Sequence, residues 1–310
     1  MTGDSDAAVT ASASPTAATT RLRLDLAYDG TDFAGWARQP NLRTVQGVLE
    51  AALATVFHRY GPPPTLTVAG RTDAGVHATG QVAHLDLTSA QLASLDTRDR
   101  QGGGPSALAR RLNGIAGLSS DVWVSASAVA PSGFDARFSA TWRVYEYRVA
   151  DATRPRNPLE RHHTLWYPAV LDEAAMAGAA EALLGLHDWA SFCKPREGST
   201  TIRTLQEFRW QRLDGVLVAR VQADAFCHSM VRSLVGASIA VGEGKLGRGD
   251  LIALRDAEQR TSAFKVAPAR GLTLLEVGYP PDSELATRAE QTRARRDAAP
   301  AQFDQPLASD

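Results

Sequence analysis

The sequence predicts an α+β fold with a largely antiparallel sheet and flanking helices. Segments whose apolar residues alternate with period two are interspersed with segments of helical period. The dipeptide Asp214-Gly215 joins two strand-like runs, which is typical of a tight β-hairpin. No repeat of fixed period indicates a solenoid. With 310 residues, 44% of them hydrophobic, the chain can bury a substantial core as two domains or one large one.

The first half is predicted as a strand, a helix and two strands that flank a loop: residues 21–28, 44–60, 65–70 and 81–87. Leu22, Leu24 and Leu26 share one face of the first strand, as period two requires. Thr44 is a plausible N-cap for the helix, whose apolar residues recur three and four positions apart until a Gly-Pro-Pro-Pro stop. The loop before the last strand therefore connects strand to strand.

The later segments predicted as strands are residues 122–130, 141–150, 205–213 and 216–223, and those predicted as helices are residues 172–186 and 229–242. Arg143 and Tyr145 lie two residues apart and so share one face of their strand. Residues 154–163, rich in Arg and Pro, break the regular pattern and indicate a crossover between two halves.

The two ends differ from the middle in composition. Residues 1–20 and 281–310 are polar, rich in Ala, Ser, Pro and Asp, and without periodicity, so we expect a disordered and a flexible tail. Residues 21–150 are expected to form an N-terminal α/β half, and residues 151–280 a C-terminal one. The first tail has no basic residue and no apolar run, so the sequence predicts neither a signal peptide nor a membrane span.

Charge and cysteine content limit the possible partners only loosely. The formal net charge is −1, but residues 21–280 carry 29 basic and 26 acidic residues and are mildly basic. Thirty of the 33 basic residues are Arg, which suits phosphate contacts but also follows from genomic base composition. Cys193 and Cys227 form no CxxC motif, so we expect reduced thiols in a cytoplasmic protein and no zinc module.

The stretch GRTDAGVHATGQVAHLDL contains one acid, Asp73, in a setting that allows several roles. With Gly75 two residues later, Asp73 is first of all a turn residue. A metal site with His77 and His84 lacks a third ligand at a familiar spacing. A glycosidase would need a second carboxylate, and Asp86 on the following strand has no special context for that role.

Three other segments interleave basic and aromatic residues: YDGTDFAGWARQPNLRTVQG, GFDARFSATWRVYEYRV and FCHSMVRSLVG. Such a mixture suits RNA, because bases stack on aromatic rings while guanidinium groups hold phosphates. In the last segment His228 and Arg232 are four residues apart and share one side of the predicted helix.

Read together, these segments resemble the tRNA pseudouridine synthase A (TruA) family. GRTDAGVHATGQVAH is similar to the family's catalytic motif, and the other three segments follow its further signatures in the same order over roughly residues 21–280. The resemblance implies a pseudouridine synthase fold with two similar halves around a central RNA-binding cleft. It also implies a cytoplasmic homodimer that isomerises uridine to pseudouridine at positions 38, 39 and 40 of the tRNA anticodon stem-loop, without metal or other cofactor.

The resemblance also assigns roles to residues. It makes Asp73 the nucleophile and Tyr145 the side chain that stacks on the flipped uracil. A guanidinium partner for Asp73 is expected from Arg71 or from Arg232, and the family pattern favours Arg232. The other residues placed at the RNA are Arg38, Gln39, Phe134, Arg137, Phe138, Arg143, Thr201, Arg203 and His228. Two positions depart from the family pattern: Val144 stands where many relatives have a basic residue, and GSTTIRT lacks a basic residue early in its segment.

Three questions stay open at the level of sequence. Asp73 could add to C1′ of the ribose, or remove a 2′ proton and give a glycal. An RNA-binding protein without catalysis would keep the basic and aromatic clusters, but it would not need an intact RTDAGVH loop. A metal-dependent hydrolase acting on nucleotides would lose its activity on chelation.

Overall fold

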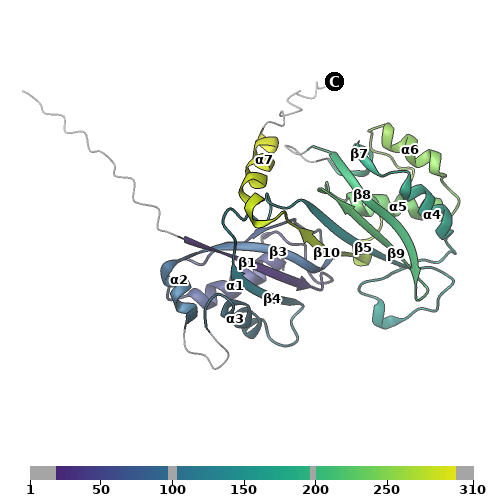
Figure 1. Cartoon of the computed structure of the whole chain (residues 1–310). Helices are drawn as coiled ribbons and strands as arrows, with labels where there is room; N and C mark the ends of the chain where they lie inside the picture. Colours follow the sequence, from purple (N-terminus) through teal and green to yellow (C-terminus); the bar gives the residue numbers. More distant parts are fainter. Residues whose placement is uncertain (1–18, 97–102, 196–199, 298–310) are drawn as a thin grey trace, which may run out of the picture.

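The computed structural model describes residues 19–96, 103–195 and 200–297, and its framework is a ten-stranded sheet (Figure 1). The strands are β1 (Thr19–Tyr28), β2 (Thr67–Val68), β3 (His77–Thr88), β4 (Val122–Val129), β5 (Trp142–Ala150), β6 (Leu165–Trp166), β7 (Gly185–Asp188), β8 (Ile202–Leu213), β9 (Val216–Ala223) and β10 (Leu272–Gly278). The α-helices are α1 (Val45–Phe57), α2 (Ser89–Ala93), α3 (Ala107–Ala116), α4 (Glu173–Glu181), α5 (Met230–Gly242), α6 (Arg248–Asp256) and α7 (Leu285–Asp297).

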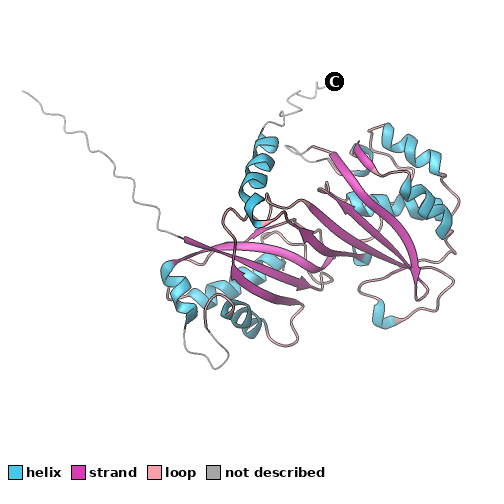
Figure 2. Ribbon diagram, viewed as in Figure 1, coloured by secondary structure: helices cyan, strands magenta, loops and turns pink. Residues whose placement is uncertain are grey.

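The strands follow the order β4-β1-β3-β10-β5-β9-β8-β7, with β2 paired to β3 and β6 to β5. Within the described residues the pairs are antiparallel except β3 with β10 and β5 with β6. The last strand, β10, lies between β3 and β5. β5, although it falls within the predicted N-terminal half, therefore pairs on both sides with strands of the C-terminal half, β10 and β9. Figure 2 shows helices gathered at both ends of this sheet. The predicted α+β fold with a largely antiparallel sheet and flanking helices is confirmed.

The N-terminal half forms as its periodicity predicts. Leu22, Leu24 and Leu26 are at most 1% exposed, because alternate residues of β1 face the core. α1 begins directly after Thr44, whose hydroxyl accepts a hydrogen bond from the Gly47 N–H at 3.2 Å. This bond satisfies one of the donors left open at a helix start. The predicted helix and its cap are confirmed.

The C-terminal half is built around the β8–β9 hairpin and α5. Asp214 and Gly215 both adopt positive φ angles, 49° and 78°, as a two-residue hairpin turn requires. Almost every residue of α5 is buried, so this helix forms the core of the half. The helix predicted over residues 172–186 ends earlier, at Glu181. Gly185, with φ of 116°, begins β7, which pairs with β8.

The C-terminal segment departs from the prediction of a flexible tail. η5 (Asp282–Glu284) leads into α7, which is anchored by Leu285 and Ala289, each 2% exposed. The Arg293 guanidinium lies 2.7 Å from the Asp135 carboxylate. The expectation of a flexible tail is therefore wrong for residues 282–297, because these contacts fix the helix. Residues 1–18 and 298–310, the rest of the two predicted tails, lie outside the described residues.

The cysteines also depart from prediction. Cys193 and Cys227 are joined by a disulfide, with their Cα atoms 5.7 Å apart. A backbone hydrogen bond of 2.9 Å from the Lys194 N–H to the His228 carbonyl holds the two segments side by side. The structure thus pairs two cysteines that were expected to be separate thiols, because a long separation in sequence says nothing about distance in the fold. Across the described ranges, no helix has the length and apolar character needed to cross a membrane.

Candidate active site

The loop that carries Asp73 lies beside the centre of the sheet, between β2 and β3. Tyr145 on β5 pairs with Leu274 on β10, and Leu274 pairs in turn with Ala78 at the start of β3. Two strand spacings, about 10 Å, therefore separate Tyr145 from the strand into which the loop runs. The register of the sheet thus brings the sequence-predicted acid and tyrosine into one region.

Backbone contacts from the segment YDGTDFAGW fix the loop. The Trp36 N–H donates to the Thr72 carbonyl at 3.0 Å, and the Gly75 N–H donates to the Phe33 carbonyl at 3.2 Å. Gly35 has φ of 96°, and a Cβ atom there would lie 2.9 Å from the Thr72 carbonyl oxygen. Only glycine meets both conditions. This segment, predicted from its composition to contact RNA, also serves as the scaffold of the loop that carries Asp73.

A buried polar network holds the loop from below. The Tyr28 hydroxyl lies 2.8 Å from the Thr72 hydroxyl, and the Gln81 amide donates to Tyr28 at 3.1 Å and to the Gly70 carbonyl at 2.9 Å. Burial raises the pKa of Tyr28 to about 12, so its phenol is neutral. Sequence reasoning missed this network. Its only signal was a glutamine at an inward position of a strand, and Gln81 is 0% exposed.

The two histidines of the motif hydrogen-bond to the backbone of neighbouring segments. His77 Nδ1 accepts a hydrogen bond from the Gly30 N–H at 3.0 Å, and its Nε2 lies 2.7 Å from the His162 carbonyl. His84 Nδ1 accepts from the Ala136 N–H at 3.0 Å, and burial lowers the pKa of His84 to about 4. Among the described residues, no group of three or more His, Cys, Asp or Glu side chains could hold a metal ion.

Asp73 has two cationic or polar partners, both from the start of α5. Arg232 Nη1 lies 3.5 Å from Asp73 Oδ2, and His228 Nε2 lies 3.5 Å from Asp73 Oδ1. Arg232 also donates from Nε to the Ala267 carbonyl at 2.7 Å, which fixes its guanidinium. Within the described ranges, these two are the ion-pair partners of Asp73, whereas Arg71 is exposed. Of the two predicted partners, the structure brings Arg232 to the acid.

Tyr145 forms one wall of the same region. Its side chain is mostly buried, with 9% exposed, and its ring meets the Phe226 ring edge-on at 5.2 Å between centroids. Burial raises the pKa of Tyr145 well above its ordinary value, so the hydroxyl is protonated at neutral pH. Phe226 lies two residues before His228 and was missed as a site residue, although it belongs to the FCHSMVRSLVG segment.

Comparison with known proteins decides the family. A protein of Leifsonia xyli subsp. xyli named tRNA pseudouridine synthase A is 66% identical over 282 residues, which cover 89% of this chain and 98% of that relative. The chain belongs to the tRNA pseudouridine synthase A family. Family members from Frankia casuarinae and Mycobacterium leprae are 56% and 49% identical, each over 89% of this chain and 95% of its own length. The sequence profile described as tRNA pseudouridine synthase matches residues 179–280. As a tRNA pseudouridine synthase, the chain is an isomerase.

Some of the predicted RNA contacts lie at the surface of this pseudouridine synthase. The Arg38 side chain is 67% exposed and 3.8 Å from the Glu50 carboxylate, and Gln39 is exposed with its amide donating to a backbone carbonyl. Arg137 is exposed, and its guanidinium lies over the Phe138 ring, 5.1 Å from the centroid. These four side chains are accessible from solvent, wholly or in part.

Phe134 is a first correction, because its ring, predicted to contact RNA, is not accessible from solvent. The ring is 2% exposed and packs against His84 and Tyr279, with ring centroids 6.2 and 5.0 Å away. Tyr279 belongs to the segment that follows β10 and donates from its hydroxyl to the Ala136 carbonyl at 2.7 Å. The aromatic residue in GFDARF therefore fills the core under its own loop.

Arg143 is a second correction, because its guanidinium points inward rather than toward RNA. Nη1 donates to the Asp224 carbonyl at 2.7 Å, while Nη2 donates to the carbonyls of Ala69 at 3.2 Å and Arg137 at 3.3 Å. Burial lowers the pKa of Arg143, but an arginine stays charged in proteins. The side chain thus bridges the end of β9, the catalytic loop and the loop before β5.

Thr201 and Arg203 are engaged with their own surroundings. The Thr201 hydroxyl donates to the Asp188 carboxylate, and Arg203 donates to the Thr200 carbonyl at 2.7 Å and to the Thr200 hydroxyl at 2.9 Å. Arg203 therefore folds back onto its own strand, which leaves little of its donor capacity for RNA.

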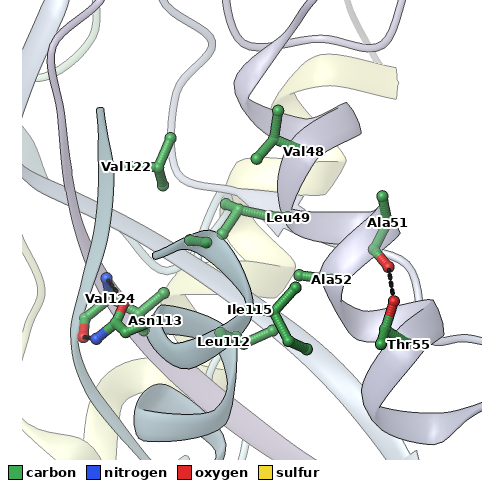
Figure 3. A pocket seen from close by; sticks show the side chains of 11 residues that line it. Val48, Leu49, Ala51, Ala52, Thr55, Leu112, Asn113, Ile115, Val122 and Val124 are labelled. Carbon is green, nitrogen blue, oxygen red and sulfur yellow. Dashed lines mark hydrogen bonds between the residues drawn. The ribbon is translucent and has the colours of Figure 1, made fainter. Parts of the chain in front are cut away.

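The larger of the two cavities described for the chain is not part of this site. It encloses about 330 Å³ between α1, α3 and β4 and is lined almost entirely by aliphatic side chains, among them Leu49, Leu112 and Ile115 (Figure 3). The Asn113 amide is its main polar group, and both of its ends bond to the backbone of Val124. Such a lining offers no group for acid, base or phosphate chemistry.

Proposed function

We propose that this enzyme isomerises uridine at positions 38, 39 and 40 of the tRNA anticodon stem-loop, with Asp73 as the nucleophile. The observation that carries the proposal is the convergence of Asp73, Arg232 and Tyr145 from three distant segments on one region at the centre of the sheet. A single carboxylate beside a fixed guanidinium, bordered by an aromatic wall, suits a reaction that detaches and reattaches one base.

The isomerisation needs one group that takes the ribose through two steps. An Asp73 oxygen attacks C1′, and the bond from C1′ to N1 breaks with its electron pair leaving on the uracil. The uracil turns, and C5 attacks C1′ while the bond from C1′ to the Asp73 oxygen breaks. The C5 proton is lost and N1 is protonated, so the atoms balance without an added reagent. In the glycal route the same carboxylate takes the 2′ proton instead.

Arg232 keeps Asp73 ready for either route. The guanidinium 3.5 Å from the carboxylate places a positive charge beside the oxygen that attacks C1′ or accepts the 2′ proton. The hydrogen bond to the Ala267 carbonyl fixes the guanidinium, so its charge stays beside the acid. His228 at the other carboxylate oxygen adds a second donor or acceptor to the site.

Tyr145 is proposed to stack on the uracil after the nucleotide has been flipped out of its stem. Flipping costs a few kcal/mol of unstacking, and an aromatic platform returns roughly 1–3 kcal/mol per base. Because burial keeps the phenol neutral, the ring and its hydroxyl act as a wall and a hydrogen-bond donor rather than as a phenolate base.

Assembly and location complete the proposal. Two chains, each with a mildly basic folded region, would present one continuous surface to a single tRNA as a cytoplasmic homodimer. The excess of basic residues in each chain is small over residues 21–280, so a shared surface helps to hold the polyanion.

The test is release of tritium from C5-labelled uridine in an unmodified anticodon stem-loop transcript. We expect release by the wild-type chain, with and without EDTA. Asp73→Asn should lower turnover by about 10⁴-fold or more while the dissociation constant for the stem-loop stays near that of the wild type. Absence of release from the wild type rules out the proposed substrate, and substantial turnover by Asp73→Asn removes Asp73 from its role.

A further inference from the structure

A second, smaller cavity lies at the start of α5 and has a polar lining unlike that of the first. It encloses about 70 Å³. The polar residues that line it are Ser191, Lys194, Ser229, Ser233, Arg260 and Thr261. The rings of Phe192 and Phe264, which also line it, stack 5.5 Å apart with 18° between their planes. Two cations and four hydroxyls thus surround a small space with apolar walls.

Ser191 gives this cavity an unsatisfied polar group. The residue is only 4% exposed and lines the cavity, and its hydroxyl has no hydrogen-bond partner in the part of the chain that the structure describes. Buried hydroxyls nearly always find a partner, so a ligand in the cavity is a direct explanation. A hydroxyl at such a place donates a hydrogen bond to an oxygen that carries negative charge.

The start of α5 adds a second attraction for an anion. The first backbone N–H groups of a helix have no acceptor within the helix, and the helix dipole makes this end positive. Ser229, the residue before α5, makes no capping bond with its side chain. Lys194 and Arg260 lie at the mouth as exposed side chains, and none of the described residues that line the cavity is acidic.

The cavity adjoins the candidate active site through the same helix turn. His228 lies in the turn before α5 and Arg232 lies in the first turn of that helix, and both reach Asp73. Ser229, the residue directly before α5, and Ser233 in its first turn line the cavity. One turn of backbone links the reacting acid to the cavity.

We propose that this cavity binds one phosphate group of the substrate RNA backbone, close to the nucleotide that reacts. This inference rests on the proposed function and adds a phosphate subsite to it. A phosphate supplies an acceptor for the Ser191 hydroxyl, which has no partner among the described residues, and oxygens for the exposed cations Lys194 and Arg260. RNA is favoured over free phosphate because Ser229 is adjacent in sequence to His228, which contacts the catalytic acid. A strand held at Asp73 therefore passes close to the cavity.

The experiment measures binding of a fluorescent anticodon stem-loop by anisotropy at several salt concentrations. The variants are Ser191→Ala, Lys194→Gln, Arg260→Gln and the double variant Lys194→Gln/Arg260→Gln. Arg248→Gln is the matched control, since Arg248 is an exposed arginine at the start of another helix of the same half. We expect the double variant to raise the dissociation constant about tenfold and to lower the salt slope by about 1, as for loss of one phosphate contact.

A second arm locates the phosphate. Stem-loops carrying one neutral methylphosphonate are compared position by position for the wild type and the double variant. We expect one position at which the neutral group weakens wild-type binding about tenfold but has no further effect on the double variant, as coupling of two partners requires. Ser191→Ala should weaken binding to a smaller extent at the same position, and Arg248→Gln should behave as the wild type.

Two results overturn the inference. One is a double variant that binds the stem-loop as the wild type does. The other is the absence of any methylphosphonate position whose effect differs between the wild type and the double variant. If calorimetry then shows that inorganic phosphate binds to the wild type and not to the double variant, the cavity takes free phosphate rather than RNA. Turnover by the wild type on the same stem-loop tests the proposed function separately, so the two ideas fail by different measurements.

Discussion

The Arg143 guanidinium donates a hydrogen bond of 2.7 Å to the backbone carbonyl of Asp224. Through its other nitrogen it reaches Ala69, at the start of the catalytic loop. One charged side chain on β5 thus ties the loop of Asp73 to the segment that leads into α5. Both parts of the site take their relative position from it.

Replacing Arg143 by Met should therefore damage both stability and catalysis. Three carbonyl groups lose their donor, of which only the Ala69 carbonyl belongs to a buried residue, and a buried acceptor left unpaired costs about 1–3 kcal/mol. We expect the free energy of unfolding in urea to fall by about 1–3 kcal/mol. We also expect a loss in kcat, because Asp73 and Arg232 lose their alignment. Arg143→Lys, which keeps one donor group, should recover part of both losses, and a variant with wild-type kcat speaks against this positioning role.

Arg232 and Arg71 should differ in their effects. Arg232→Met removes the charge beside Asp73, and we expect kcat to fall about 100-fold or more, which corresponds to about 2.7 kcal/mol of lost transition-state stabilisation. Arg71→Met, at an exposed position, should mainly weaken RNA binding. Tritium release at saturating and at low stem-loop concentrations separates the two effects. Equal losses of kcat in both variants contradict the assignment of Arg232 as the partner.

The ring of Tyr145 should matter more than its hydroxyl. Because the phenol stays protonated, Tyr145→Phe keeps the stacking surface and should retain most of the activity. Tyr145→Leu removes the aromatic platform, and we expect kcat/KM to fall roughly tenfold or more, in line with about 1–3 kcal/mol per stacked base. If Tyr145→Phe is as inactive as Tyr145→Leu, the hydroxyl is the group that catalysis requires, and stacking on the ring is not.

His84 should make the folded state sensitive to acid. Its pKa is about 4 in the folded chain against 6.5 as the ordinary value, mainly because of burial. The unfolded chain therefore binds the proton first, so stability is complete above pH 6.5 and declines as the pH falls toward 4, by up to about 3 kcal/mol. Urea unfolding at several pH values should show a shallower decline for His84→Gln, whose amide can still accept from Ala136. Parallel declines in both proteins place the acid sensitivity elsewhere.

Sequence periodicity was sufficient to predict the strands, helices and turns that depend on local preferences. The alternation in β1, the helical spacing of α1 and the Asp-Gly turn between β8 and β9 each state a local preference that the fold keeps. The family resemblance predicted that Asp73, Tyr145 and Arg232 belong to one site. In the structure, Arg232 Nη1 lies 3.5 Å from Asp73 Oδ2. Because the sequence shows the face of a strand but not the reach of a long side chain, Arg143 was expected at the RNA and is found inside.

The remaining differences between the predictions and the structure have one cause. A few contacts with residues distant in sequence can hold a segment in place, and the segment's own composition does not reveal them. α7 has only Leu285 and Ala289 as buried anchors on an otherwise polar helix, so its composition indicated a tail. The burial of Phe134 depends on Tyr279, just before that helix, and could not be predicted without it. The pairing of Cys193 with Cys227 likewise follows from the path of two loops rather than from spacing.

The position of β10 has a consequence for how the enzyme is made. β3 and β5 carry the two sides of the site, yet they become neighbours only through residues 272–278, close to the end of the chain. Such distant pairing is slow to form, because a long loop must close before the contact can contribute. During synthesis, the nascent chain therefore has Asp73 and Tyr145 in place long before it has an active site. A product that stops short of β10 should leave its tRNA unmodified.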